Sequence, residues 1–142
     1  MKSLKSKPAL GLIVIAVIMV FMAFLTDIYW FASWIGRPFP RSVPLEEKVA
    51  QAFALPDVIG SLLMYASAYG LLRRRVWAIY STLISLGMSF GSNLFFLSLT
   101  GFTFLNILGP SLLFILFTFF YLWIRRTLFF SGEKEENEIS HL

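Results

Sequence analysis

The chain has 142 residues and a formal net charge of +4; 58% of the residues are hydrophobic and 14% are charged. A water-soluble domain carries about 25% charged residues, so this composition excludes an ordinary soluble fold and indicates an integral membrane protein. There is no cysteine, and the one histidine is His141, next to the C-terminus. These counts exclude disulfides, thiolate metal sites and His-based catalytic sites within the fold, and we expect no metal and no cofactor.

The first apolar segment follows a basic N-terminus that contains Lys2, Lys5 and Lys7. No charge occurs between Lys7 and Asp27. A helix over residues 9–34, rising 1.5 Å per residue, is long enough to cross the ~30 Å hydrocarbon core. A cleaved signal peptide is the alternative, but the apolar run is long for one and no small-x-small cleavage site follows it. We therefore predict a retained first transmembrane helix.

The segment over residues 36–50 separates the first two apolar runs, and its three prolines break any long helix there. The second apolar run predicts a helix over 52–72. It contains Pro56 and Asp57 near its start, and three arginines at 73–75 end it.

No charged residue occurs over residues 76–124, a stretch of 49 residues. This is too long for one span but fits two helices of about 22 residues joined by a tight turn. We predict helices over 77–99 and 104–124, with the turn at Gly101, because glycine accepts turn conformations readily. The charged tail over 131–142 is expected to be frayed or disordered.

The basic residues predict how the single domain, residues 1–130, sits in a membrane. Four helices place both ends of the domain on one side. The N-terminal segment, the second loop and the C-terminal tail hold nine Lys and Arg residues, whereas the first loop holds three and the third none. The positive-inside rule then makes both termini cytoplasmic, and Tyr29, Trp30 and Trp34 form an aromatic belt at the outer edge. The expected fold class is an all-α, integral membrane four-helix bundle, in a prokaryotic plasma membrane. Its basic residues face anionic membrane lipid, and no nucleic acid is expected as a partner.

Each predicted helix carries one carboxylate or amide at a similar depth, ~24–30 Å along the helix from the nearest cytoplasmic basic residue. These side chains are Asp27, Asp57, Asn93 and Asn106. Ser61 and Tyr65 follow Asp57 at four-residue intervals and so share its helix face. Near a membrane surface such residues cost little, and Asp57 directly after Pro56 suits a helix start. An ion pair of Asp27 with Arg37 or Arg41 of the first loop is a further alternative, so a purely structural interpretation stands. The functional interpretation is that they converge on a pocket with a polar mouth between the helices.

Small residues follow one side of the third predicted helix. Ser81, Ser85 and Ser89 lead to Asn93 at four-residue spacing, beside a GxxxG pair formed by glycines 87 and 91. Helix packing is the ordinary explanation of such a stripe, and packing it inward also brings Asn93 inward.

Short patterns in this sequence resemble those of two kinds of four-helix membrane protein. A small bacterial family of unassigned function is similar in Leu25-Thr26-Asp27 followed by Tyr29-Trp30, in Leu55-Pro56-Asp57, in Ile84-Ser85-Leu86 and in Pro110. That likeness implies a fold but no activity. More loosely, the layout resembles the emopamil-binding and sigma-2 receptor class, whose members hold a hydrophobic amine or sterol in a membrane-embedded pocket. This second resemblance implies that Asp27 and Asp57 are acidic partners of a ligand amine. The class's isomerases use a histidine and glutamates, which the predicted spans lack.

The polar layer favours a membrane-embedded protein that binds a lipid-like or cationic amphipathic small molecule from the outer side. The expected ligand-binding residues are Asp27, Asp57, Ser61, Tyr65, Asn93 and Asn106. The alternative is a structural or accessory subunit that packs against another membrane protein, or a second copy, through the Ser/Gly face of the third helix. A small proton-linked transporter or channel is the third possibility. Catalysis is not indicated, because the predicted spans contain no His, Lys or Cys.

Overall fold

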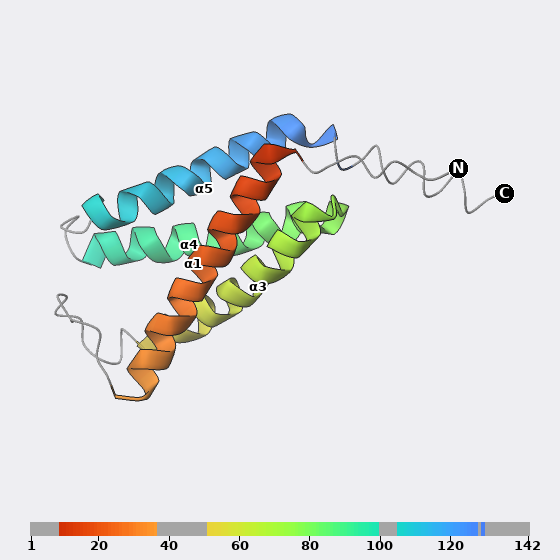
Figure 1. The fold of residues 1–142 in the computed structure, drawn as a ribbon. Helices are drawn as coiled ribbons and strands as arrows, with labels where there is room; N and C mark the ends of the chain where they lie inside the picture. Colours follow the sequence, from red (N-terminus) through yellow and green to blue (C-terminus); the bar gives the residue numbers. More distant parts are fainter. Residues whose placement is uncertain (1–8, 37–50, 100–104, 128, 130–142) are drawn as a thin grey trace.

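Four α-helices make up most of the computed structural model, which describes residues 9–36, 51–99, 105–127 and 129. In chain order they are α1 (Leu10–Trp34), α3 (Ala54–Leu72), α4 (Val76–Leu99) and α5 (Leu105–Arg125), and the described residues include no strand (Figure 1). The expected all-α class with four helices is therefore confirmed. The N-terminal lysines, the three prolines after Gly36, the turn expected at Gly101 and the charged tail lie outside the described residues.

Each helix is long and apolar enough to cross a membrane. The shortest, α3, has 19 residues, and the longest, α1, has 25. These lengths correspond to ~28 Å and ~37 Å at 1.5 Å per residue. Large apolar side chains point outward from every helix; Leu62, Leu113 and Ile124, for example, are 63%, 69% and 72% exposed. Such an apolar exterior matches a hydrocarbon environment, because a soluble protein would bury much of it.

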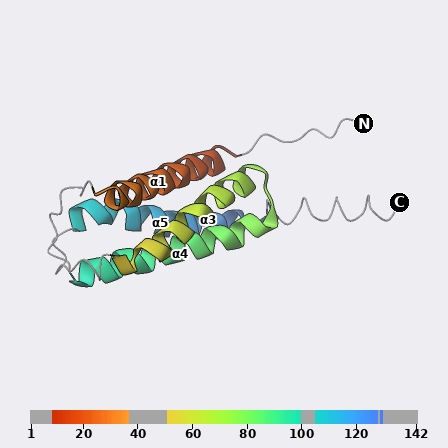
Figure 2. The same cartoon turned by 90° about the horizontal axis from the view of Figure 1, so that it is seen from below.

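Neighbouring helices in the chain run in opposite directions and pack mainly in sequence order, α1 on α3, α3 on α4 and α4 on α5 (Figures 1 and 2). The start of α1, the turn between α3 and α4, and the end of α5 therefore lie together. We call this the arginine end, because it carries Arg73–Arg75, Arg125 and Arg126. We call the opposite end, where α3 begins near Asp57, the aspartate end.

The turn between α3 and α4 is tight. The Arg75 N–H donates to the Gly70 carbonyl at 2.9 Å and the Arg74 N–H donates to the Leu71 carbonyl at 3.0 Å, which is the hydrogen-bond pattern of a Schellman motif. Arg74 takes the left-handed conformation that this motif requires, with φ of 52°. Gly70 allows the two helices to approach, since a Cβ added there would lie 2.6 Å from the Ala78 Cβ.

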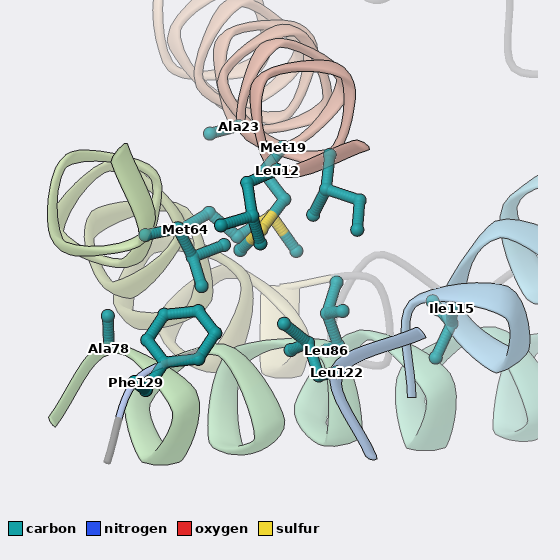
Figure 3. Close-up of a cluster of buried hydrophobic side chains, with 11 residues drawn as sticks. Leu12, Met19, Ala23, Met64, Ala78, Leu86, Ile115, Leu122 and Phe129 are labelled. Atoms are coloured by element: carbon teal, nitrogen blue, oxygen red, sulfur yellow. The ribbon is translucent and has the colours of Figure 1, made fainter. Parts of the chain in front are cut away.

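The apolar core extends from the arginine end to the middle of the bundle and contains side chains from all four helices (Figure 3). Its fully buried members include Leu12 and Met19 of α1, Leu86 of α4 and Leu122 of α5. The start of α1 also reaches α5, because a Cβ at Gly11 would collide with the Tyr121 side chain. The arginine end is thus held by apolar packing, whereas the aspartate end contains most of the polar contacts described below.

Candidate functional site

Asp27 joins α1 to α3 through both of its carboxylate oxygens. Ser61 donates a hydrogen bond to Oδ1 at 2.6 Å, and the Tyr65 hydroxyl donates one to Oδ2 at 2.9 Å. Because Ser61 and Tyr65 lie one helical turn apart on α3, a single carboxylate accepts from both. Hydrogen bonds to a charged acceptor are shorter and stronger than neutral ones, which agrees with the 2.6 Å distance to Ser61.

Asp57 makes the opposite connection, from α3 to α1. The Trp30 Nε1–H donates to Asp57 Oδ2 at 3.1 Å, and the Ser92 side chain of α4 lies near this carboxylate. Trp30 is only 5% exposed, whereas Tyr29 and Trp34 are 45% and 69% exposed. Trp30 therefore points into the bundle, whereas its neighbours in the predicted aromatic belt, Tyr29 and Trp34, point outward. A buried indole needs an acceptor for its N–H, and Asp57 supplies it.

The sequence spacing explains this reciprocal arrangement. Asp27 and Trp30 are three residues apart on α1, and Asp57, Ser61 and Tyr65 are spaced by four on α3, so each set shares a helix face. Since α1 and α3 are antiparallel, the two faces meet with each aspartate opposite a donor of the other helix. Ser61, which contacts Asp27, is four residues or ~6 Å along the helix from Asp57. We refer to these five residues as the aspartate cluster.

Among the described residues, the aspartate cluster has no positively charged hydrogen-bond partner. Both aspartates are half-buried, and every described hydrogen-bond donor to them is neutral: the Ser61 and Tyr65 hydroxyls for Asp27 and the Trp30 indole for Asp57. Neutral donors stabilise a carboxylate but leave its charge uncompensated, and partial burial weakens the screening by water. A cationic group placed beside the cluster would supply a compensating charge.

The two asparagines of the expected site differ in position. The Asn93 side-chain amide donates to the Ser111 hydroxyl at 3.2 Å, a neutral bond between α4 and α5. Asn93 is half-buried and directs its amide toward α5, and no described hydrogen bond joins it to the aspartate cluster. Asn106 is exposed on the first turn of α5 and has no described side-chain hydrogen bond. The structure therefore brings Asp27, Asp57, Ser61 and Tyr65 together, whereas the described hydrogen bonds do not include Asn93 or Asn106 in this group.

The serine stripe of α4 faces inward but contacts different helices at its two ends. The Ser81 and Ser67 hydroxyls are 2.8 Å apart and connect α4 to α3, whereas Asn93 reaches Ser111 on α5. A four-residue step on an α-helix advances about 40° beyond a full turn, so three steps rotate the direction by about 120°. This drift carries the stripe from the α3 side to the α5 side.

Comparison with known proteins identifies no matching protein-family model, curated protein or solved structure. The resemblances to four-helix families therefore stay predictions, and the function is argued from the geometry. Within the described residues, no group of three or more His, Cys, Asp or Glu could hold a metal ion. Trp30 and Ser92 were not among the neighbours expected for Asp57 from the sequence. The signal available for Trp30 was its spacing, since it lies one helical turn after Asp27.

Proposed function

We propose that this protein is an integral membrane four-helix bundle that binds a cationic amphipathic small molecule at the aspartate cluster. The observation that supports this most directly is that two half-buried carboxylates, Asp27 and Asp57, accept their described hydrogen bonds from neutral donors alone. A ligand ammonium group would supply a positive charge that none of the described hydrogen-bond donors carries. Its apolar tail would lie against the apolar helix surfaces.

The position of the cluster favours an amphiphile over a fully polar cation. Asp57 is the fourth residue of α3, so it lies close to one end of a membrane-spanning segment. Asp27 lies seven residues before the end of α1 at Trp34, which is ~10 Å along the axis. An amphiphile can reach both aspartates, because its charged head stays near the membrane surface while its tail enters the hydrocarbon.

We further propose that the arginine end is cytoplasmic, that both termini lie on that side, and that the membrane is a prokaryotic plasma membrane. The supporting observation is the clustering of Arg73–Arg75, Arg125 and Arg126 at one end of the bundle, which the positive-inside rule assigns to the cytoplasm. The natural absence of cysteine makes this easy to test. Gly101→Cys should react with an impermeant maleimide from outside in intact cells, and Arg73→Cys should not. The reverse labelling would contradict the orientation.

Ligand binding is tested with dodecylamine, an amine on a single apolar chain, and dodecanol as its uncharged counterpart. Purified protein is placed in nanodiscs of zwitterionic lipid, and binding is measured by equilibrium titration. An ammonium 4 Å from a carboxylate gains about 4 kcal/mol at an effective dielectric constant of 20, part of which desolvation offsets. Asp27→Asn with Asp57→Asn should therefore weaken dodecylamine binding at least about tenfold and leave dodecanol unchanged.

The matched control is Ser111→Ala, which removes an interhelical polar contact outside the aspartate cluster. This variant should bind dodecylamine as the wild type does. Equal binding of dodecylamine by the wild type and the double Asn variant would dispose of the proposal, provided that both proteins keep their helix content.

The second candidate, an accessory subunit that packs through α4, has one observation in its favour. Gly87 and Gly91 are exposed, and a Cβ added at either would meet nothing within 4 Å. The Ser/Gly face is nevertheless divided, because Ser85 is buried inside the bundle. If this face binds another helix, Gly87→Leu with Gly91→Leu should abolish co-purification of the partner without unfolding the chain.

A further inference from the structure

The arginine end gathers the positive charge of the described residues. Five arginines lie there, three in the α3–α4 turn and two at the end of α5. The only acidic residues in the described part of the chain are Asp27 and Asp57, which lie toward the opposite end. The exposed members of this group include Arg73, Arg125 and Arg126.

Two of these arginines are held in place by aromatic rings. The Arg73 guanidinium lies over the Tyr69 ring, with Cζ 5.0 Å from its centroid, and the Arg126 guanidinium lies over the Trp123 ring at 4.7 Å. Both rings are themselves exposed, Tyr69 by 57% and the indole by 69%. A guanidinium that stacks through its face keeps the N–H groups in its plane available for a phosphate. Holding the side chain in advance also lowers the entropy cost of binding.

The backbone of the turn holds Arg74 in an uncommon conformation. Arg74 occupies the left-handed position of the Schellman motif, where glycine is the usual residue because a side chain there costs about 1–2 kcal/mol. The chain nevertheless carries an arginine at this position, so that three cationic residues follow one another without a break.

The two groups of arginines are brought to the same end by packing. Phe129 follows α5 and is 1% exposed, and it packs in the core beside Ala78 at the start of α4 (Figure 3). Ala78 lies only three residues after Arg75. The chain that continues from Arg125 and Arg126 is therefore anchored against the first turn of α4.

We propose that the arginine end binds the phosphate groups of anionic phospholipids in the adjoining leaflet, with Arg73 and Arg126 as the principal ligands and Tyr69 and Trp123 as their supports. Charge complementarity selects an anionic headgroup, and the exposed rings match the depth of the headgroup region. This surface is separate from the aspartate cluster and does not depend on the function proposed for it.

The experiment is native mass spectrometry of the detergent-solubilised full chain, titrated with phosphatidylglycerol or with phosphatidylcholine of identical acyl chains. An arginine near an anionic membrane surface contributes about 1 kcal/mol, which is about fivefold in affinity. Arg73→Gln and Arg126→Gln should each weaken phosphatidylglycerol binding about fivefold and leave phosphatidylcholine binding unchanged. Arg→Lys at the same positions should recover part of the affinity, because lysine keeps the charge but not the planar face.

The matched control is Arg125→Gln, which removes the same charge from the end of α5 but leaves the Arg126–Trp123 pair intact. It should weaken phosphatidylglycerol binding less than Arg126→Gln. Equal losses for these two variants would assign binding to net charge and overturn the role of the stacked pairs. Equal affinity of the wild type for both lipids, or competition by inorganic phosphate as effective as that by phosphatidylglycerol, would overturn the lipid assignment.

Discussion

The hydrogen bond between Tyr65 and Asp27 offers the sharpest test of the aspartate cluster. Tyr65→Phe removes one hydroxyl, whose oxygen lies 2.9 Å from Asp27 Oδ2, and leaves the ring in place. Hydrogen bonds to charged groups contribute about 1.5–3 kcal/mol to folding, whereas interhelical bonds measured within membranes average about 0.6 kcal/mol and reach about 1.7. Because this acceptor is a half-buried carboxylate, we expect a loss near the upper membrane value, about 1–1.5 kcal/mol.

The assay is reversible unfolding by dodecyl sulfate in mixed micelles, applied to a double-mutant cycle of Tyr65→Phe and Asp27→Asn. The cycle isolates the pairwise term from other effects of each substitution. We expect a coupling energy of about 1 kcal/mol. Ser111→Ala, which removes the neutral 3.2 Å bond to Asn93, should cost about 0.6 kcal/mol and sets the scale for an uncharged contact. A coupling below about 0.3 kcal/mol would refute the reasoning, since the carboxylate would then gain nothing from the tyrosine.

Two further predictions concern the turn between α3 and α4. Gly70→Ala should destabilise the bundle by about 1–3 kcal/mol in the same assay, because its Cβ would lie 2.6 Å from that of Ala78 and the helices would have to separate; unchanged stability would contradict this close approach. The Arg74→Val protein should be less stable than the Arg74→Gly protein by about 1–2 kcal/mol. Both substitutions remove the arginine side chain, but only valine has a Cβ that disfavours the left-handed backbone conformation. Equal unfolding midpoints would show that the turn does not hold this conformation.

Four helices could be predicted from the sequence because the apolar runs and the charges that end them are local features. The residues 76–124 contain no charge, and the need to divide them into two spans follows from membrane thickness alone. The shared helix face of Asp57, Ser61 and Tyr65 was likewise available from their four-residue spacing, although its direction toward the bundle interior was not. These inferences require no knowledge of which helix packs against which.

The partners of the polar residues could not be predicted in this way. Asn106 has the same depth and chemistry as Asn93 along the chain, but it is exposed, whereas Asn93 bonds to Ser111. From the sequence alone, Trp30 is equally consistent with a place in an aromatic belt and with a buried hydrogen-bond donor. The choice depends on its partner, Asp57, on the neighbouring helix. The depth of a residue in the membrane follows from its position along one helix. The direction of its side chain depends on how that helix is rotated relative to the others.

By itself, the sequence therefore determined the number of apolar helices, the polar face on α3 and the concentration of cationic residues at one end of the bundle. Only the tertiary structure decided that Asp27 accepts hydrogen bonds from Ser61 and Tyr65, and that Asp57 accepts one from Trp30. The physical reason is that helix formation depends on bonds within one segment and on its average hydrophobicity. A side-chain pair between helices depends on crossing and rotation, which arise from the packing of the whole bundle.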